Sequence, residues 1–428
     1  MSTINEALKV NLDVEIKGEA TLVSPAEETP KGSYLLSNLD MAPVMVQTIY
    51  CFNKTFDNEM DAAQTIKEGL AKVLVYYYPL AGRLTMNEKH KFMINCTGEG
   101  ALFLEAEANC TLEEIDDFMK PESVTLGRLC YDAGGAQNPA LLAAQVTKFK
   151  CGGFVFALSM NHIMFDGIGA MEFVNSWGEI TRGLPLSNPP YLDRTLLRAR
   201  NPCKVEFNYG LEEIVDISNT VSPLEEEMLI NKSFVFHPEK LDQLKKKAME
   251  DGVLKKCTTF ETLTAFTWRA QTKSLGLHPD QQVRILFAVN ARSKLNPPLP
   301  EGYFGNAVLY MSCQSSAEML DRPLSSTIWK IQETINSVTN NYVRSAIDFL
   351  EEHKGMPVMT HSTFVSAWSR LAFHSVDFGW GVPFYSGPLN VPRNSVLFLP
   401  CGKDRKGINV FLSLTASSMK VFEELIEV

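Results

Sequence analysis

Long apolar runs and an excess of positive charge are both missing from this chain of 428 residues. No uninterrupted apolar stretch approaches the roughly 18 residues that a membrane-spanning helix needs. The opening residues, MSTINEALKVNLDVEIKGEA, contain neither the basic segment nor the apolar core of a secretory signal. Against 40 Lys and Arg stand 50 Asp and Glu, which gives a formal net charge of −10. We therefore expect a soluble cytoplasmic protein without stable membrane insertion, and no broadly basic surface for nucleic acid.

Paired cysteines are missing as well. The nine cysteines are scattered without a C-x-x-C pair, and their number is odd. A chain of this length can build a large core, so it does not depend on disulfide bonds for stability. We expect reduced, mostly buried thiols and a reducing compartment.

The motifs of several common enzyme classes are also absent. The sequence contains no G-x-S-x-G, no G-x-x-x-x-G-K-[ST] and no G-x-G-x-x-G. These absences disfavour a serine hydrolase, a P-loop enzyme and a Rossmann dehydrogenase. No internal repeat of fixed period and no low-complexity tract is present either.

What the sequence does contain is an alternation of strands and helices in both halves. The first half has helical spacing over 61–76 and 170–182 and predicted strands over 142–150 and 154–162. A second cycle has predicted strands over 233–237, 283–290, 363–367, 396–400 and 410–414, and predicted helices over 238–251, 259–274, 325–340, 342–353 and 417–426. We predict an α/β protein with two domains, over 1–183 and 229–428, joined by a proline-rich and then acidic crossover over 184–228.

His162 is the first candidate for chemistry. It stands at the end of the apolar strand over 154–162, and a glycine-rich turn with Asp166 follows it, in the pattern H-x-x-x-D-G. A histidine at a strand end can face a cleft and move a proton near neutral pH. On a helix the two residues could share a metal ion, but Gly167 and Gly169 favour a turn, and no third ligand lies nearby. A core histidine that bonds only to backbone remains an alternative.

Two glycine- or proline-rich segments are further candidates. In Asp377-Phe378-Gly379-Trp380-Gly381 the glycines permit a close backbone approach, and the indole N–H could point at a specific group. The alternative is a packed aromatic residue in a glycine-rich turn. Arg292, before a proline-rich loop, could present a fixed guanidinium to a carboxylate or phosphate, or could be solvated.

A basic cluster precedes a predicted helix start. It consists of Lys245–Lys247 with Lys255 and Lys256, followed by Thr258 and Thr259. Cations and hydroxyl groups at a helix start suit phosphate binding. A solvated charged face explains the same pattern.

Taken together, the motifs from His162 to Gly167 and from Asp377 to Gly381 resemble the two signatures of the plant BAHD acyltransferases. The resemblance covers essentially the whole chain, through YYPLAGRL at 77–84, FKCGG at 149–153, DRTLLRAR at 193–200 and PPLPEGYFGN at 297–306. Within the family, segments 25–40 and 160–186 most resemble hydroxycinnamoyl transferases that feruloylate ω-hydroxy fatty acids and fatty alcohols.

The resemblance implies two similar mixed-sheet domains of the chloramphenicol acetyltransferase type, with the active site at their interface. An acyl-CoA donor and an alcohol acceptor, both small-molecule substrates, would enter a channel from opposite sides and meet at His162. His162 would be the general base, and the Trp380 N–H would stabilise the oxyanion. The resemblance implies no metal and no cofactor beyond the acyl-CoA co-substrate, and a monomer.

Further site residues follow from the resemblance. Asp166 is expected to be structural and to pair with Arg292, which would fix the turn that carries His162. Asp377 and Gly379 are expected to be structural too. The residues that would contact the phosphates of CoA are Lys255, Lys256, Thr258 and Thr259.

The acceptor pocket is where this chain departs from shikimate-using relatives. Those relatives have small residues where this chain has Met164 and Phe165, and tend to have Arg where it has Val382. Both changes make the site more apolar, which favours a long-chain alcohol. Arg370, by contrast, could bind an acidic acceptor or merely support the site.

The leading hypothesis is therefore an enzyme that moves a hydroxycinnamoyl group, such as feruloyl, from CoA to an ω-hydroxy fatty acid or fatty alcohol. One alternative is transfer to shikimate, quinate, or a short or aromatic alcohol. An alternative from another class is a catalytically silent protein that binds CoA or a hydrophobic ligand.

Overall fold

The computed structural model describes residues 12–54, 60–115, 118, 126–131, 139–219, 227–353, 359–402 and 404–427. Residues 1–11, which belong to the segment searched for a secretory signal, and residues 220–226 of the expected crossover lie outside these ranges. Within these ranges no helix combines the length and the apolar character needed to cross a membrane.

The chain divides into two compact units, and neither is one continuous stretch of sequence. Unit 1 comprises Met1–Thr195, Pro300–Asn306 and Leu371–Asn390, and unit 2 comprises Leu196–Leu299, Ala307–Arg370 and Val391–Val428. The predicted contiguous division at 183 and 229 differs from this result. The physical reason is strand pairing, because β14 (Tyr385–Pro388), late in the sequence, pairs with β4 (Met45–Phe52) of unit 1.

Unit 1 is built on a mixed sheet with the strand order β1-β7-β8-β9-β4-β14, and β2 also pairs with β7. The remaining strands of this sheet are β1 (Val14–Ile16), β2 (Thr21–Val23), β7 (Ala101–Ala108), β8 (Leu142–Lys148) and β9 (Phe154–Asn161). A smaller sheet contains β3 (Gly32–Leu35), β6 (Phe92–Cys96) and β5 (Arg83–Met86).

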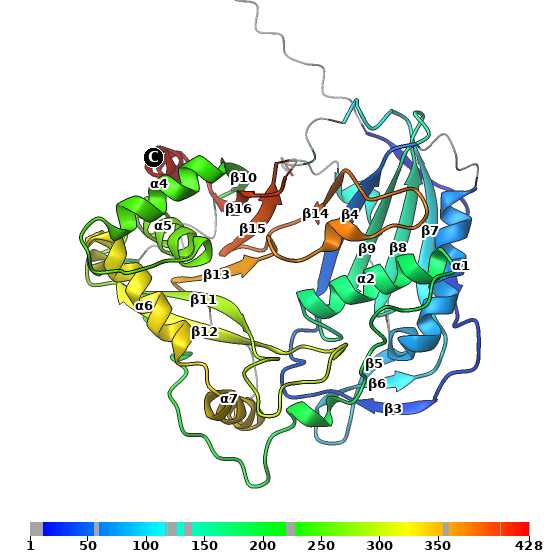
Figure 1. The fold of residues 1–428 in the computed structure, drawn as a ribbon, viewed down its shortest axis with the longest axis horizontal. Coiled ribbons are helices and arrows are strands. Elements are labelled where there is room, and N and C mark those ends of the chain that lie inside the picture. Colours follow the sequence, from blue (N-terminus) through cyan, green and yellow to red (C-terminus); the bar gives the residue numbers. More distant parts are fainter. Residues whose placement is uncertain are drawn as a thin grey trace, which may run out of the picture. The chain divides into compact units, whose positions relative to one another are not determined.

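Helices α1 (Ala62–Tyr76) and α2 (Gly167–Thr181) pack against each other over one face of the large sheet (Figure 1). The side chain of Asp61 accepts hydrogen bonds from two N–H groups of the first turn of α1 and so caps the helix. Apolar residues at helical spacing then face inward, among them Ile66, Leu70 and Val73, which are fully buried.

Unit 2 is built on a second mixed sheet, with the order β10-β16-β15-β13-β11-β12. Its strands are β10 (Leu229–Phe236), β11 (Gln282–Asn290), β12 (Val308–Ser316), β13 (Ser362–Ala367), β15 (Ser395–Cys401) and β16 (Gly407–Thr415). Its helices are α4 (Pro238–Met249), α5 (Thr259–Ser274), α6 (Leu324–Asn336), α7 (Asn340–Glu352) and α8 (Ala416–Ile426). Short 3₁₀ helices in the two units are η1 (Tyr78–Ala81), η2 (Leu126–Leu129), η4 (Arg194–Leu197), η5 (Glu318–Asp321) and η6 (Phe373–Ser375).

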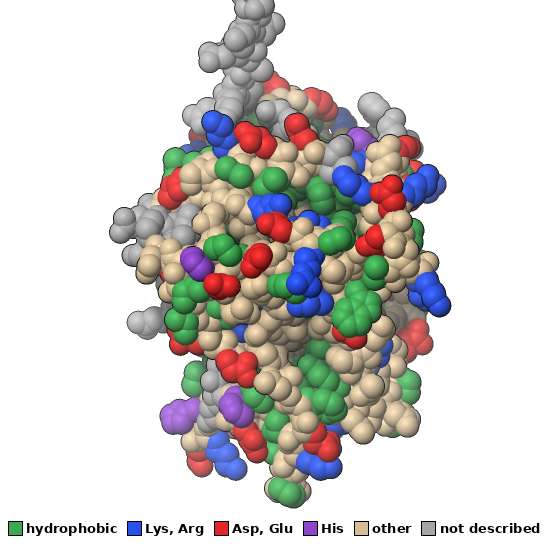
Figure 2. Space-filling view, turned by 90° about the vertical axis from the view of Figure 1, so that its left-hand side faces the viewer, with side chains coloured by type: hydrophobic (Ala, Val, Ile, Leu, Met, Phe, Trp, Pro, Cys, Tyr) green, Lys and Arg blue, Asp and Glu red, His purple; other side chains and the backbone are tan. Residues whose placement is uncertain are grey.

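Helices α4, α5, α6 and α8 of unit 2 contact one another and cover its sheet (Figure 1). Figure 2 looks onto this helical side and shows Lys and Arg side chains interspersed with Asp and Glu, with hydrophobic groups between them. The start of α5 is fixed by a capping box, in which Thr258 and Glu261 each bond to the backbone of the other. The sequence therefore specifies where this helix begins.

A buried carboxylate of unit 2 is one of the groups that hold the described part of the crossover in place. Asp348 of α7 accepts hydrogen bonds from the backbone N–H groups of Arg200 and Lys204, each at 2.8 Å, and pairs with the Arg200 guanidinium at 2.7 Å. These bonds lower the pKa of Asp348, although burial acts in the opposite direction. The irregular part of the crossover that follows η4 thus gains a fixed path along unit 2.

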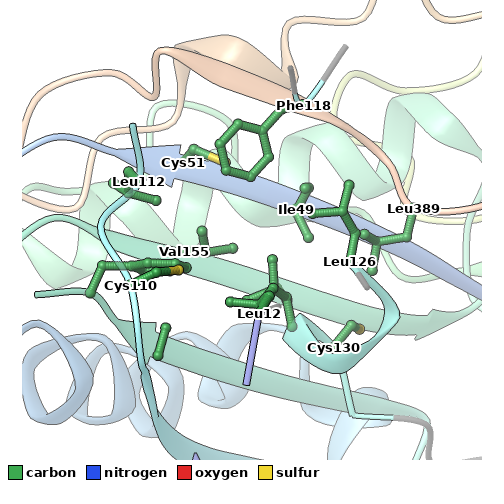
Figure 3. Close-up of a cluster of buried hydrophobic side chains, with 14 residues drawn as sticks. Leu12, Ile49, Cys51, Cys110, Leu112, Phe118, Leu126, Cys130, Val155 and Leu389 are labelled. Atoms are coloured by element: carbon green, nitrogen blue, oxygen red, sulfur yellow. The ribbon is translucent and has the colours of Figure 1, made fainter. Parts of the chain in front are cut away.

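A hydrophobic cluster fills the second face of the unit 1 sheet (Figure 3). It combines strand residues such as Ile49 and Val155 with Leu389 and with three thiols, those of Cys51, Cys110 and Cys130. Burial raises the pKa of the Cys51 thiol well above its ordinary value, so this sulfur stays protonated. Six of the nine cysteines are buried, which confirms the prediction of mostly buried thiols.

Candidate functional site

His162 directly follows the last residue of β9, an interior strand of the unit 1 sheet. Every residue of β9 is buried, because the strand lies between β8 and β4 with helices on one face and the cysteine-containing cluster on the other. The strand ends at Asn161, and the backbone N–H of His162 donates to the Val44 carbonyl at 2.8 Å. His162 itself is partly exposed, so its side chain leaves the core at this point.

A tight turn follows the histidine. The Asn161 side-chain oxygen accepts from the N–H of Ile163 at 3.1 Å, and the Phe165 N–H donates to the His162 carbonyl at 3.3 Å. Asp166 then caps α2, because its Oδ1 accepts from the N–H groups of Ile168 and Gly169, both at 3.1 Å. Asp166 is buried, and its carboxylate fixes the start of the helix behind the histidine. A turn rather than a helix thus separates His162 from Asp166.

A buried ion pair contacts the backbone of this turn. Asp40 Oδ2 lies 2.7 Å from Arg194 Nη1, and the two side chains are 0% and 1% exposed. Arg194 Nη2 also donates to the Met164 carbonyl at 2.6 Å, inside the turn. Burial disfavours a charged guanidinium, yet the negative charge of Asp40 more than compensates and raises the pKa of Arg194. Both groups are therefore charged in the core, where a lone charge would be very unfavourable.

Asn306 connects the ion pair to the histidine backbone. Its Nδ2 donates to Asp40 Oδ1 at 2.8 Å and to the His162 carbonyl at 2.9 Å, while its backbone N–H donates to Asp40 Oδ1 at 3.0 Å. The N–H and hydroxyl of Ser37 donate to the other oxygen of Asp40, each at 2.8 Å. The carboxylate is thus fully engaged, and the position of the His162 backbone depends on it.

A glycine next to Asn306 permits this packing. The Arg194 side chain runs so close to Gly305 that a Cβ there would come within 2.8 Å of Arg194 Nε. The guanidinium also lies 5.5 Å from the ring centres of Tyr34 and Phe304. Any side chain at position 305 would therefore displace Arg194 from its ion pair.

Burial shifts the histidine toward its neutral form. It lowers the pKa of His162 below 6.5, although the charges of Asp166 and Asp40 and the contact with Asn306 act in the opposite direction. Among the described residues, Nδ1 of the ring is buried without a hydrogen-bond partner. A neutral imidazole with this environment is ready to accept a proton near pH 7.

Asp40, Arg194 and Asn306 were not among the site residues expected from the sequence. Each lies in a segment that carried the family resemblance: Asp40 and Asn306 at the ends of segments 25–40 and 297–306, and Arg194 in the run 193–200. Charged or amide side chains inside motifs were the available signal. What the sequence could not supply was their proximity, since Asp40 and Asn306 are 266 positions apart.

The Asp377–Gly381 motif forms a self-contained turn in unit 1. Asp377 Oδ1 accepts from the N–H groups of Gly379 and Gly381 at 2.7 and 3.0 Å, and Oδ2 lies 3.4 Å from Arg182 Nη1. The turn packs on α2 so closely that a Cβ on Gly178 would come within 2.6 Å of the Asp377 carbonyl oxygen. Asp377 and Gly379 therefore act in holding this turn against the helix.

Trp380 lies at the wrong end of β9 for the predicted oxyanion role. Its ring packs edge-to-face on Phe154, with 5.5 Å between ring centres, and Phe154 is the first residue of β9. A strand rises roughly 3.3 Å per residue, which places Phe154 on the order of 25 Å from His162. An oxyanion donor has to lie about 3 Å from the oxygen that forms next to the catalytic base. The prediction for Trp380 is therefore wrong, because the motif packs at the opposite end of β9 from His162.

We expect Trp380→Phe to keep kcat within a few-fold of the unaltered enzyme. Phenylalanine preserves the aromatic contact with Phe154 and removes only the indole N–H, which the structure places far from His162. The measurement is steady-state acyl transfer by the two proteins. A loss of about 100-fold, as oxyanion-hole donors cause, would restore the role that the sequence suggested.

The predicted acceptor residues in unit 1 also need correction. Val382 is 60% exposed and follows the Trp380 turn, and Phe384 N–H donates to the Cys51 carbonyl at that same distant edge. Phe165 is buried against Phe173 and Phe304, with ring centres 6.2 and 5.3 Å away. These packing contacts make Phe165 part of the core of unit 1, and Val382 lies near the opposite end of β9 from His162.

Met164 behaves as Phe165 does. It is fully buried, and its carbonyl is the acceptor for Arg194. The prediction that Met164 lines the acceptor pocket is therefore wrong for this structure, in which the residue stabilises the turn. The segment between His162 and Asp166 is apolar because it packs inward.

The predicted CoA-binding residues gather at the start of α5 in unit 2. Lys255, Lys256 and Thr258 are exposed there, and Thr259 is partly exposed. Thr258 is the N-cap of α5, and its hydroxyl oxygen accepts from the Glu261 N–H at 3.2 Å. The site thus combines two ammonium groups with the positive end of a helix dipole.

Two arginines of unit 2, Arg292 and Arg370, were assigned roles from the sequence that the structure does not test. The backbone N–H of Arg292 donates to Asn290 Oδ1 at 3.0 Å, directly after β11. Its expected pairing with Asp166 would join the two units and stays a prediction. Arg370 is exposed beyond the end of β13, and its contact with an acceptor also stays a prediction.

The arrangement of possible metal ligands can be stated for the described residues. Among those residues, no group of three or more His, Cys, Asp or Glu side chains is arranged to hold a metal ion.

Comparison with known proteins bears on the whole chain. The Transferase family model matches residues 12–428. Omega-hydroxypalmitate O-feruloyl transferase of Arabidopsis thaliana is 50% identical over 425 residues, which cover 97% of this chain and 93% of that protein. Fatty alcohol:caffeoyl-CoA acyltransferase of the same plant is 47% identical and covers 96% of this chain and 97% of its own.

A solved structure supports the fold in the same way. The crystal structure of vinorine synthase superimposes with a TM-score of 0.75 at 22% identity, over 96% of each chain. The predicted α/β fold with two mixed sheets is confirmed. Since the family model spans nearly all of the sequence and a relative shares half of its residues, the chain belongs to the BAHD Transferase family of acyl-CoA-dependent acyltransferases.

Proposed function

We propose that this chain transfers a feruloyl or closely related hydroxycinnamoyl group from CoA to the hydroxyl group of an ω-hydroxy fatty acid or a fatty alcohol. The observation that carries the chemistry is the state of His162. Its ring is partly exposed at the end of β9, burial keeps it neutral, and its backbone is held by Asn306 and the Asp40–Arg194 ion pair.

In the proposed mechanism, His162 removes the proton from the acceptor hydroxyl as that oxygen attacks the thioester carbonyl. The bond between the carbonyl carbon and the CoA sulfur then breaks, and the imidazolium returns its proton to the departing thiolate. Because Nδ1 is buried, Nε2 is the nitrogen that would face the alcohol. No acyl-enzyme is needed if the donor and the acceptor are held together.

The proposed CoA site is the start of α5. Lys255 and Lys256 would neutralise phosphate oxygens, and the free N–H groups at the helix start and the hydroxyl groups of Thr258 and Thr259 would donate to them. The thioester end of the same acyl-CoA would be the part that reacts at His162. No metal and no further cofactor takes part in the proposal.

Support for the acceptor class comes from the relatives. The two Arabidopsis thaliana proteins that are 50% and 47% identical are named for a feruloyl transfer to ω-hydroxypalmitate and a caffeoyl transfer to fatty alcohols. Benzyl alcohol O-benzoyltransferase of Nicotiana tabacum is only 38% identical. Shikimate O-hydroxycinnamoyltransferase of the same plant is 33% identical. The likeness is therefore greater to the long-chain enzymes.

We expect the pH profile of the reaction to report the lowered pKa of His162. The base works when neutral, so kcat/KM should fall only as the pH drops through a pKa below 6.5. The same shift affects stability: below 6.5 the unfolded chain binds a proton that the native ring still refuses, so the free energy of unfolding decreases as the pH falls. The check is kcat/KM from pH 4.5 to 8, and an apparent pKa clearly above 6.5 would contradict this assignment.

The donor side of the proposal is tested with purified protein and 16-hydroxyhexadecanoate as the acceptor. Feruloyl-, caffeoyl-, p-coumaroyl-, benzoyl- and acetyl-CoA are compared, and the ester products are identified by mass. We expect the hydroxycinnamoyl donors to react and feruloyl-CoA to be among the best. Turnover with acetyl- or benzoyl-CoA alone would overturn the donor assignment while leaving the acyltransferase itself intact.

A further inference from the structure

The helical layer of unit 2 contains an open pocket of about 540 Å³. It lies between the end of α4, the middle of α5, the start of α6 and the end of α8. Its apolar wall is formed by Leu244, Ala248, Phe266, Ala270, Leu324 and Leu425. A volume of this size is in the range that binds small organic molecules. All of its lining residues belong to unit 2, so the pocket is complete within one unit.

One charged group in this pocket has no partner of its own. Arg269 of α5 is partly buried, and within the described chain its guanidinium makes neither a hydrogen bond nor an ion pair. Burial lowers its pKa, and the more distant charge of Asp321 only partly offsets this effect. A guanidinium carries five N–H donors, and leaving them unmatched in a partly desolvated site is unfavourable. The arginine is thus suited to an acceptor that the chain itself does not supply.

The other charged groups that line the pocket determine what kind of anion fits. Lys273 is paired with Asp321 at 2.7 Å, and Asp251 accepts from the Ser325 hydroxyl and from the Val253 N–H. Lys247 and Glu250, both exposed at the end of α4, carry opposite charges. With Lys247 balanced by Glu250 and Lys273 by Asp321, the positive charge of Arg269 and the negative charge of Asp251 remain. The Asp251 carboxylate already accepts from Ser325 and Val253, so Arg269 is the charged group that still has donors to offer a ligand. A second negative charge on the ligand would meet Glu250 and Asp251.

We propose that this pocket is a binding site for a singly charged amphiphile, an aliphatic chain that ends in a carboxylate. The carboxylate binds the Arg269 guanidinium through two parallel hydrogen bonds, the geometry that this group favours. The chain lies along the apolar wall. Each added methylene strengthens binding about fourfold for as long as the pocket has room.

The proposal is independent of the proposed transfer reaction. None of the lining residues belongs to the turn of His162, to the Asp40–Arg194 ion pair or to the start of α5. Lys247 is the one lining residue from the basic cluster that the sequence analysis considered for phosphate, and here it faces a carboxylate site instead. A ligand in this pocket is neither a donor nor an acceptor of the acyl group.

The test is calorimetric titration of dodecanoate into the full-length protein, with three variants for comparison. We expect Arg269→Gln to weaken dodecanoate binding at least about tenfold, because a charge-assisted bidentate contact is lost. Arg269→Lys should lose less, since it keeps the charge without the fork. Lys246→Gln, an exposed neighbour of Lys247 that does not line the pocket, is the matched control and should bind as the unaltered protein does.

Chain length and head group complete the test. Octanoate should bind more weakly than dodecanoate, and dodecyltrimethylammonium should not compete with it. The proposal is overturned if dodecanoate fails to bind at millimolar concentration, if Arg269→Gln binds it unchanged, or if the cationic amphiphile competes. Thermal unfolding of the free variants serves as the folding control, because removing an unpaired, partly buried charge should not lower Tm.

Discussion

Replacing His162 by alanine is expected to lower kcat/KM for acyl transfer about 10²–10⁴-fold, the usual contribution of a positioned general base. The expected affinity for acyl-CoA is unchanged, because the proposed phosphate contacts lie on α5 and not on the turn after β9. Acyl transfer is measured by product mass, and CoA binding by calorimetry on the same preparation. The two readouts separate a loss of chemistry from a loss of substrate.

The matched control is His90→Asn. His90 is exposed, lies in unit 1 and has a positive φ of 57°, a conformation that asparagine tolerates. This variant should retain full activity. If His162→Ala also retained activity within about threefold, His162 would not be the base. If the unaltered protein itself showed no turnover, a silent ligand-binding role would be the better account.

Replacing Asp40 by alanine is expected to lower the free energy of unfolding by about 3–5 kcal/mol, because it leaves the buried Arg194 charge without its partner. It also removes the acceptor for Asn306 and Ser37, and with it the support of the His162 carbonyl. For a unit of this size the change corresponds to a decrease in Tm of roughly 6–20 °C. Thermal unfolding followed by circular dichroism measures it.

Two further variants show whether the cause is the stranded charge. Asp404→Ala removes an exposed carboxylate whose partner, Lys406, lies 3.7 Å away, and it should change Tm very little. The double variant Asp40→Asn with Arg194→Met removes both charges and should be less destabilised than Asp40→Ala alone. Equal losses for the single and double variants would mean that packing, rather than the unpaired charge, accounts for the effect.

Local patterns in the sequence predicted the elements around the site well. The strand before His162, the start of α1 after Asp61 and the whole of α5 follow from apolar periodicity and from capping side chains. Both signals act over a few residues, and so they do not depend on contacts with distant parts of the chain. Resemblance to the family suggested a structural role for Asp166, and in the structure this residue caps α2. Its expected pairing with Arg292 stays a prediction.

Long-range register is what the sequence could not provide. The late strand β14 pairs with β4, which brings the Trp380 turn to the first residue of β9, while His162 follows its last residue. Two motifs that resemble signatures of one family therefore lie at opposite ends of one strand, β9. For the same reason the Asp40–Arg194–Asn306 network could not be predicted, because its members contact one another across large distances in sequence.

Buried side chains were misread for a related reason. Met164 and Phe165 stand next to the catalytic candidate in sequence, which suggested that they contact the acceptor. Instead, both are buried: the Phe165 ring packs on Phe173, and the Met164 carbonyl accepts a hydrogen bond from Arg194. Neighbours of a catalytic residue in sequence often stabilise its backbone and do not touch the substrate.

The central claim is tested most directly by a competition among acceptors in one reaction. Purified protein receives feruloyl-CoA together with equal concentrations of 16-hydroxyhexadecanoate, 1-hexadecanol, benzyl alcohol and shikimate, and the ferulate esters are quantified by mass spectrometry at low conversion. The ratio of products equals the ratio of kcat/KM values. The account predicts that esters of the two C16 acceptors dominate. A product mixture dominated by feruloyl shikimate or benzyl ferulate would contradict it.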